Sequence, residues 1–436
     1  MGQPSVSLVM IVRDEARHLG RCLGSVADLV GEVVVVDTGS RDETREVARG
    51  FGARVVDFPW VDDFAAARNE SLRRASGEWI FWLDADEWLD EEGRGRLAAK
   101  LERLRPDDRS VYLIHQRSGL GEDDGATLSI VQPRLFRAGP EIRYRYRVHE
   151  QVIDACVARG DVPRLADITV RHSGYESSEG SKAKRARNVR LLRLDLLDDP
   201  GDPWLLFQVG RDLLRDDFAE AERLLLDALE RSEPGHSLVR KALSLLAAGY
   251  RERGRIAEAE ARVAEGLGRF PNDTTLLIEA SALALLGGDP RRAEAACLRL
   301  LGEPPDDDEF LGGVDLDARG WRARHNLGMA LLARGKPAQA EGQWRRALAE
   351  RPDSAPLWLG LAEAALARRR WRAFDRAVAR LEAFDPPPHD LPPDAPAILK
   401  GRAAAARSGA APRFGPGRVP AAYRRRRSSR GVPDLA

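Results

Sequence analysis

Short apolar runs alternate with amphipathic segments through the first 175 residues. Four runs are rich in β-branched and aromatic residues, which predicts strands. They cover 5–12, 32–37, 53–57 and 79–84. The segments between them have the spacing of helices and cover 15–29, 44–51 and 64–75. Because strands alternate with helices and read as continuous apolar runs, we predict an α/β fold with a mostly parallel sheet.

Beyond residue 200 the pattern changes to Ala, Leu, Arg and Glu in helical period. Gly254, Gly288 and Gly335 are each followed five residues later by Ala-Glu and 17 residues later by Pro. This spacing is typical of the tetratricopeptide repeat, a helix–turn–helix unit of about 34 residues. Weaker units span 204–234 and 358–386. Such units stack on their neighbours to form an all-α solenoid with one continuous core.

These changes of pattern divide the chain into three predicted parts. Residues 1–198 form the α/β domain, 199–386 the helical repeats, and 387–436 a tail rich in Pro, Ala and Arg that is predicted to be disordered. The arginine run 424–427 has the charge to touch nucleic acid or an anionic surface, although a solvated tail is the simpler interpretation. The loop 118–126 is predicted to be mobile and to close over a bound donor.

The composition argues against several classes of protein. The 69 basic and 69 acidic residues give a formal net charge of zero, so we expect no nucleic-acid binding by the whole chain. No apolar run approaches the length of a membrane span, so no transmembrane segment is predicted. The chain enters its first strand without a signal segment, and Cys22, Cys156 and Cys297 lack metal-site spacing. A cytoplasmic, reducing location fits this pattern.

Two aspartates end the most apolar of the predicted strands. Asp84 and Asp86 follow 79–83 directly, and ligands of parallel sheets bind at the carboxyl ends of the strands. An unpaired carboxylate is costly to bury, so a cation is expected here, most simply a divalent metal with oxygen ligands. Asp86 is the expected direct ligand, and Asp84 is expected to hold ribose or metal-bound water. A solvated turn is the alternative.

The other strand ends bring polar residues to the same edge. Arg13 and Glu15 follow the first predicted strand, and Asp37 ends the second. An aspartate in this place can accept a hydrogen bond from a ribose hydroxyl or a base N–H. The alternative is a capping role at the next helix, for which Ser40 and Asp42 are stronger candidates.

Four further side chains are candidates for chemistry at this edge. Arg68 follows a loop and fits either a phosphate contact or an ion pair on a helix surface. Glu150 is a candidate general base, with His149 as its orienting or substrate-binding neighbour. His172 follows a late apolar run and is a candidate third metal ligand, although a lone histidine is usually structural.

Together these segments resemble the family 2 glycosyltransferases of the GT-A fold. The resemblance spans residues 5–195 and depends first on 11–15, 36–42, 64–69 and 82–87. The later segments are similar to a subgroup in which tetratricopeptide repeats follow the catalytic domain, including bacterial peptide S-glycosyltransferases. These later segments are 134–137, 148–150 and 172–175.

The resemblance implies a nucleotide-diphosphate-sugar donor, Mg2+ or Mn2+, and inversion at the anomeric carbon. The family's DxD motif falls on Asp84 and Asp86, and its late metal-binding histidine on His172. The acid that contacts the nucleoside falls on Asp37, with Arg13 and Glu15 beside it.

The implied base position departs from the family pattern, because the usual acidic pair reads His149-Glu150 here. In the expected mechanism the donor diphosphate binds a metal held by Asp86 and His172. Glu150 then deprotonates an acceptor hydroxyl or thiol, which attacks the anomeric carbon. Metal charge and Arg68 stabilise the leaving nucleotide.

The repeats suggest a peptide or protein acceptor, or a protein partner on the tetratricopeptide surface, with a stabilising or dimerising role as the alternative. Two other functions compete. A nucleotidyltransferase would carry a Gly-rich phosphate loop after the first strand, where this chain has 13–15 instead. A non-catalytic repeat adaptor with a relic sugar-nucleotide fold would not need the acidic strand ends.

Overall fold

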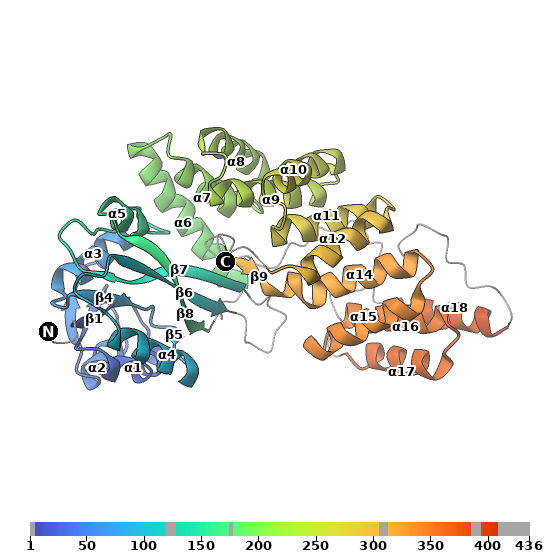
Figure 1. Cartoon of the computed structure of the whole chain (residues 1–436), viewed down its shortest axis with the longest axis horizontal. Coiled ribbons are helices and arrows are strands. Elements are labelled where there is room, and N and C mark those ends of the chain that lie inside the picture. Colours follow the sequence, from blue (N-terminus) through green and yellow to red (C-terminus); the bar gives the residue numbers. More distant parts are fainter. Residues whose placement is uncertain (1–4, 119–127, 174–177, 305–312, 385–393, 409–436) are drawn as a thin grey trace. The chain divides into compact units, whose positions relative to one another are not determined.

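The computed structural model describes residues 5–118, 128–173, 178–304, 313–384 and 394–408. The chain divides into two compact units, with the division in sequence between Glu233 and Pro234 (Figure 1). The first unit therefore holds the sheet and the three helices that follow it. The boundaries expected from composition, at residues 198 and 386, stay predictions.

One sheet organises the first unit. Its strands lie in the order β3-β2-β1-β4-β7-β6-β8-β5, and the first four are mutually parallel. Beyond β4, β7 runs antiparallel to both β4 and β6, and β6 is parallel to β8. The predicted α/β class is confirmed, and the parallel part is the part predicted from apolar runs. The strands are β1 (Val6–Val12), β2 (Glu32–Asp37), β3 (Arg54–Asp57), β4 (Trp79–Trp82), β5 (Glu87–Trp88), β6 (Ser110–Ser118), β7 (Leu128–Arg137) and β8 (Val162–His172).

Helices cover both faces of this sheet (Figure 1). Leu8 and Met10 of β1 pack in one core with α1 and α4, while Val9, which points the other way, packs in a second core with α3. This alternation is why the strands are apolar on both faces. The helices around the sheet are α1 (Ala16–Gly24), η1 (Ala27–Leu29), α2 (Thr44–Gly50), α3 (Phe64–Arg74), α4 (Glu91–Glu102) and α5 (Ile153–Ala158).

Three helices complete the first unit: α6 (Ser178–Asp198), α7 (Pro203–Leu213) and α8 (Phe218–Arg231). Helix α7 packs against both α6 and α8. The contact with α8 is close, because a Cβ added to Gly210 would lie 2.9 Å from Leu225 Cγ. The α7–α8 pair corresponds to the weak repeat unit predicted over 204–234.

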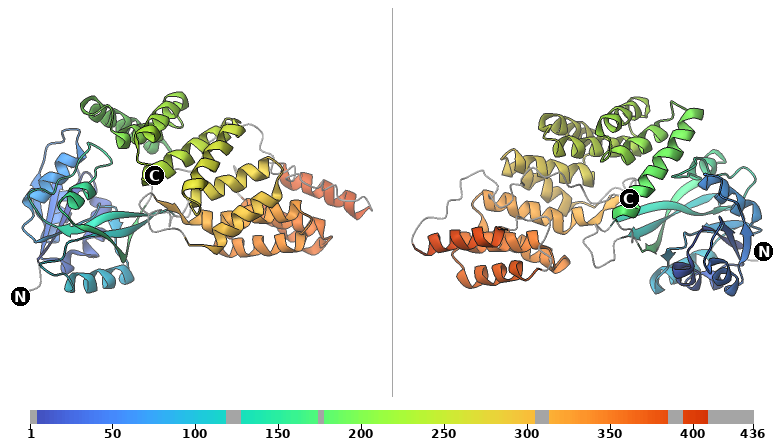
Figure 2. Two further views of the ribbon diagram at one scale, coloured as in Figure 1. Left: turned by 45° about the horizontal axis from the view of Figure 1, so that its top comes forward. Right: turned by 180° about the vertical axis from the view of Figure 1, so that it is seen from behind.

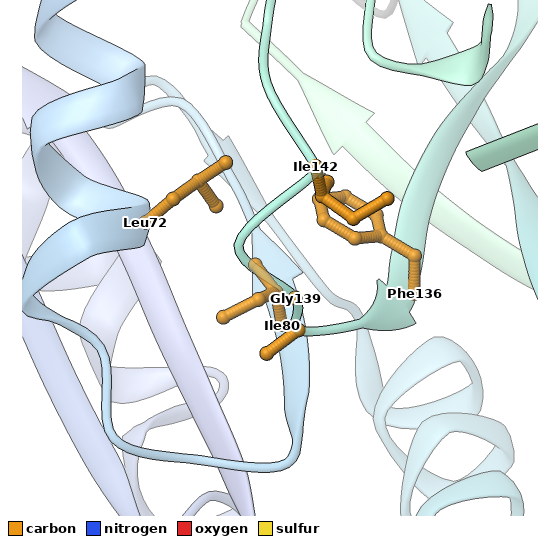
Figure 3. A pocket seen from close by; sticks show the side chains of 6 residues that line it. Leu72, Ile80, Phe136, Gly139 and Ile142 are labelled. Carbon is orange, nitrogen blue, oxygen red and sulfur yellow. The ribbon is translucent and has the colours of Figure 1, made fainter. Parts of the chain in front are cut away.

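A small apolar cavity of about 20 Å³ lies between α3, β4 and the segment after β7 (Figure 3). It is lined by Leu72, Ile80, Phe136, Ala138, Gly139 and Ile142. The space holds no more than a water molecule, and its lining offers few polar partners, so we read it as a packing gap.

The second unit consists of paired helices that follow one another along the chain (Figure 2). Gly254, Gly288 and Gly335 end the first helix of three pairs with φ values of 73°, 76° and 71°, a conformation that favours glycine. The predicted repeats are confirmed. The elements are α9 (Ser237–Glu252), α10 (Ile256–Arg269), α11 (Thr274–Leu286), α12 (Pro290–Gly302), β9 (Val314–Asp315), η2 (Leu316–Arg319), α14 (Trp321–Ala333), α15 (Pro337–Glu350), α16 (Ala355–Ala367), α17 (Trp371–Glu382) and α18 (Ala395–Arg407).

Helix α18 lies inside the segment predicted to be a disordered tail. Its Leu399, Ala403 and Ala406 are buried in the same core as α16 and α17, so a helical face is present in an Ala-rich sequence. The rest of that tail, with the arginine run, lies outside the described residues, as does 119–126 of the predicted mobile loop. Among the helices that the structure describes, none has the length and apolar character needed to cross a membrane.

Candidate functional site

The carboxyl ends of three neighbouring strands meet at one edge of the sheet. Strand β1 lies between β2 and β4 and is parallel to both, and Val12 pairs with Asp37 in register. The segments after these strands therefore emerge together, as the topology predicts. They carry Arg13, Glu15, Asp37, Asp84 and Asp86.

The loops after β1 and β2 are fixed to each other by hydrogen bonds. The Asp14 N–H donates to Ser40 Oγ at 2.9 Å, and Asp14 Oδ1 accepts from the Arg41 N–H at 2.7 Å. The Glu15 N–H donates to Thr44 Oγ1 at 2.8 Å. Asp14 itself has a φ of 55°, so these bonds hold a backbone conformation that is uncommon outside glycine.

Asp37 is buried and uses only one of its two oxygens. Its Oδ1 accepts from the N–H groups of Gly39 and Ser40, both at 3.0 Å, and from Arg45 Nη2 at 2.8 Å. Burial alone would raise the pKa of Asp37, but the hydrogen bonds from Ser40, Gly39 and Arg45 lower it. Among the described residues, none donates to Oδ2. Asp37 therefore caps the turn that follows it and keeps an ionised oxygen spare.

A buried ion pair holds the turn that carries Asp84 and Asp86. Arg134 from β7 binds Glu87 in a bidentate pair at 2.5 and 2.6 Å, and neither side chain reaches solvent. Glu87 Oε2 also accepts from the Asp84 N–H at 2.8 Å. The pKa of Glu87 is raised by burial, against the opposing effect of Arg134. These two residues, to which the sequence analysis gave no role, fix the backbone of the aspartates.

Asp86 and His172 are brought together by the pairing of β5 with β8. Glu87 lies opposite His172 in register, so His172 Nε2 lies 3.0 Å from Asp86 Oδ2. The Nδ1 atom of the same ring lies 3.1 Å from Ser118 Oγ. Although burial acts in the opposite direction on each group, their contact lowers the pKa of Asp86 and raises that of His172.

Negative charge is concentrated at this edge. The pKa of Glu15 is raised to about 7, first by burial and then by the charges of Asp86 and Asp84. A divalent cation would relieve this repulsion. Within the described ranges no three acidic, His or Cys side chains are arranged as a complete metal site. Asp86 and His172 could together offer two ligands, and Mg2+ or Mn2+ ions can take their remaining ligands from water and phosphate.

Arg68 joins two of the predicted site residues. It lies in α3, is buried, and donates from Nε to Glu150 Oε1 at 2.5 Å and from Nη2 to Asp84 Oδ1 at 2.8 Å. Its guanidinium carbon lies 4.3 Å from the ring centroid of Trp82. Burial opposes its charge, but the carboxylates of Asp84 and Glu150 raise its pKa. Arg68 therefore connects the aspartate turn to the candidate base.

Glu150 lies in a tight loop between β7 and α5. Arg145 and Gln151 close this loop with two backbone hydrogen bonds of 2.9 and 3.1 Å. Within it, Tyr146 and His149 have φ values of 70° and 56°, which L-residues rarely adopt. A conformation of this kind persists only where surrounding contacts fix it.

The ring of His149 is turned toward α7. Its Nε2 lies 2.7 Å from Arg211 Nη2 and 3.6 Å from Asp212 Oδ2. Burial and the charge of Arg211 lower the pKa of His149, so the neutral ring accepts from Arg211. Its predicted catalytic role stays a prediction. Arg211 and Asp212 lie in the helical repeats, where no sequence signal connected them to the site.

Two segments of the chain match known sequence families. Residues 7–151 match the family model described as glycosyl transferase family 2, and residues 321–364 match that of the tetratricopeptide repeat. Residues 7–151 therefore have the sequence pattern of a family 2 glycosyltransferase domain. The matched region includes every strand-end residue described above, whereas His172, Arg211 and Asp212 lie beyond it.

Two known proteins are similar to part of this chain. The chain is 35% identical over 257 residues to a TPR repeat-containing protein of Synechococcus elongatus, covering 57% of this chain and 62% of that protein. It is 30% identical over 224 residues to the SPbeta prophage-derived glycosyltransferase SunS of Bacillus subtilis, covering 48% and 49%. The chain thus spans less than two thirds of the length of either relative.

Solved structures are similar at low identity. A crystal structure of S. aureus TarS 1–349 is 14% identical, with 68% of this chain and 89% of that chain covered and a TM-score of 0.32. A structure of glucosyl-3-phosphoglycerate synthase from Mycobacterium tuberculosis in complex with Mn2+, UDP and phosphoglyceric acid is 17% identical, with 44% and 78% covered and the same score.

Proposed function

We propose that this protein is a metal-dependent glycosyltransferase that moves a sugar from a nucleotide-diphosphate-sugar to an acceptor with inversion. The family 2 domain supports the class of reaction. The single observation that carries the details is the shared edge of the sheet, where Asp86 contacts His172 and Arg68 links Asp84 to Glu150.

The donor nucleotide is proposed to bind at the ends of β1 and β2. The spare Oδ2 of Asp37 is an acceptor for a base N–H or a ribose hydroxyl, since its other oxygen is already used. The half-exposed side chain of Arg13 supplies positive charge near the diphosphate. Glu15, whose N–H is held by Thr44, lies close enough to the aspartate turn for the charges of Asp86 and Asp84 to raise its pKa.

Asp86 and His172 would hold Mg2+ or Mn2+, with Asp84 contacting ribose or a metal-bound water. When bound, such an ion offsets the charge that develops on the leaving nucleotide diphosphate. The ion pair of Glu87 with Arg134 holds Asp84 and Asp86 in place by fixing their backbone.

Glu150 is proposed to take the proton from the acceptor hydroxyl or thiol. The acceptor oxygen or sulfur then forms a bond to the anomeric carbon while the bond from that carbon to the diphosphate oxygen breaks. The bonding electrons leave with the nucleotide diphosphate. One displacement inverts the configuration. Arg68 holds the Glu150 carboxylate beside Asp84 and keeps both groups in fixed positions.

The acceptor is proposed to be a peptide or a protein, or to be presented by a protein bound to the tetratricopeptide repeats. Helix pairs of this kind commonly provide surfaces for extended peptides. The match at 321–364 supports a protein-binding role for the repeats.

The test is a screen of UDP-, GDP- and dTDP-sugars for nucleotide release by the full chain, with Mn2+, with Mg2+ and with EDTA. We expect release from one nucleotide class that is abolished by EDTA and restored by added metal. Isothermal titration of the free nucleotide diphosphates with and without Mn2+ complements the screen. The proposal would be refuted if no nucleotide showed either metal-dependent release or metal-dependent binding.

A further inference from the structure

The loop that carries Glu150 contacts helix α3 and also helices α6 and α7. On the α3 side, Asn69 bonds to both backbone groups of Tyr144, at 2.8 and 3.0 Å, and the Phe64 N–H donates to the Arg147 carbonyl at 2.8 Å. The loop therefore has one set of anchors within the matched glycosyltransferase region. A second set comes from helices beyond it.

Three loop residues bond to α6, to α7 or to the Asp202 that caps α7. The Arg147 N–H donates to Asp195 Oδ2 of α6 at 2.8 Å. The Tyr146 hydroxyl donates to Asp202 Oδ2 at 2.8 Å. Arg211 of α7 donates to the His149 ring at 2.7 Å. The two residues with positive φ, Tyr146 and His149, are the two that α7 and its cap hold.

Asp202 connects this loop to the start of α7. Its Oδ1 accepts from the N–H groups of Trp204 and Leu205, at 2.8 and 3.1 Å, while its Oδ2 accepts from Tyr146. One carboxylate therefore caps the helix and binds the loop. Gly210 lets α7 pack closely against Leu225 of α8, and this packing limits how far α7 can shift. The hydrogen bonds from α7 and Asp202 therefore hold the loop in a fixed position.

We propose that Asp202 and Arg211 are positioning residues for Glu150, so that the first helices after the glycosyltransferase region are part of the catalytic unit. This inference rests on the proposed function. It predicts that loosening the α7 contacts displaces the base without changing the nucleotide site, since Asp37 bonds to the turn after β2 and Asp86 pairs with His172.

The test compares Tyr146→Phe and Arg211→Met with the unaltered full chain. Tyr112→Phe is the matched control, because the Tyr112 hydroxyl also donates to an aspartate, Asp108 Oδ2 at 2.6 Å, but lies in β6 away from the loop. Hydrogen–deuterium exchange of peptides covering 143–151 measures the loop. We expect exchange over 143–151 to be about tenfold faster in the Tyr146 and Arg211 variants, because each of these two loses a hydrogen bond that holds the loop. Exchange should be unchanged in the Tyr112 control.

Activity separates positioning from a merely structural role. With the donor that the nucleotide screen identifies, kcat should fall about tenfold in both variants while the KM for donor and the UDP–Mn2+ or GDP–Mn2+ affinity stay within about twofold. Arg211→Lys should recover part of kcat, since it keeps a donor toward His149.

Unchanged exchange over 143–151 in both the Tyr146 and the Arg211 variant would overturn the inference. Faster exchange with an unchanged kcat would also overturn it. The exchange experiment needs no substrate. A chain that binds no nucleotide would therefore defeat the proposed function, while the link between α7 and the loop would be judged from exchange alone.

Discussion

The imidazole Nε2 of His172 lies 3.0 Å from Oδ2 of Asp86, although the two residues are far apart in the sequence. Their meeting depends on two short elements. Strand β5 is only Glu87–Trp88, and its pairing with the end of β8 is what puts His172 beside the aspartate turn. The pair places one carboxylate oxygen and one ring nitrogen at the edge where Glu15 and Asp84 add negative charge, and we propose that both bind the metal.

This pair predicts the effect of removing either ligand. Asp86→Asn or His172→Ala should weaken UDP–Mn2+ or GDP–Mn2+ binding by about a hundredfold or more, because loss of a direct ligand exceeds the ten- to hundredfold loss typical of an outer partner. Isothermal titration measures it. Glu92→Gln, an exposed acid of α4, is the control and should bind as the unaltered chain does. Full Mn2+-dependent binding by Asp86→Asn would contradict the metal role.

Replacing the candidate base Glu150 should change the rate of transfer but not the affinity for the nucleotide. Glu150→Gln keeps an oxygen that can accept from Arg68 Nε, so the loop should be undisturbed. Transfer should lose about 10²–10⁴-fold in kcat, the usual contribution of a general base, while nucleotide binding is unchanged. Steady-state kinetics with the identified donor, together with titration of the nucleotide, measures both. A kcat within about threefold of the unaltered chain would exclude Glu150 as the base.

The sequence was informative where structure is local. The apolar runs predict β1, β2 and β4 because a strand buried on both faces has a continuous apolar sequence of its own. The acids at the ends of β2 and β4 are placed by topology alone. The glycines of the repeats are found for a similar reason, since Gly254 occupies a left-handed turn that its own backbone requires.

The rest of the site depends on contacts between remote segments. Arg68 fitted a phosphate contact or an ion pair in sequence, and only the fold shows that it binds Asp84 and Glu150 together. The ring of His149 faces Arg211, a residue on a helix whose pattern predicted only packing. No periodicity or spacing encodes such pairs, because the distance between them is set by the fold as a whole.

Substitutions in the buried Glu87–Arg134 pair should affect the free energy of unfolding and Mn2+-dependent nucleotide binding in different ways. Arg134→Met should lower the free energy of unfolding by about 3–5 kcal/mol, because it leaves a fully buried carboxylate unpaired. Adding Glu87→Leu should recover most of this loss. It should not recover Mn2+-dependent nucleotide binding, since the Asp84 N–H then lacks its acceptor. Chemical denaturation and titration measure the two effects, and a double variant as unstable as Arg134→Met would count against the pair.

The close packing of Gly360 against Trp344 predicts that a methyl group added at Gly360 will lower the stability of the second unit. A Cβ on Gly360 of α16 would lie 2.2 Å from Trp344 Cε2, and the Trp344 ring is fully buried. Gly360→Ala should therefore destabilise the second unit by about 1–3 kcal/mol. Gly342→Ala in α15 is the matched control, because its Cβ would meet nothing within 4 Å and alanine favours a helix. Thermal unfolding should show opposite shifts; a stabilised Gly360→Ala would show that α16 can move away.

Burial of His325 in α14 predicts that the second unit loses stability in mild acid. Burial lowers the pKa of His325 to about 4, and its Nδ1 accepts from Trp344 Nε1 at 3.3 Å, which requires the neutral ring. The unfolded chain, with an ordinary histidine pKa, binds the proton more readily between pH 6.5 and 4, so stability falls as the pH falls through this window. Between pH 7 and pH 5 the loss from this group should be at most about 2 kcal/mol, because the ring keeps partial contact with solvent. Denaturation in urea at both pH values should show a smaller loss of stability in His325→Asn than in the unaltered chain, because asparagine keeps an acceptor but cannot become charged. The control is His236→Asn, which replaces an exposed histidine and should lose as much stability as the unaltered chain. Equal losses in all three chains would mean that another group sets the acid sensitivity.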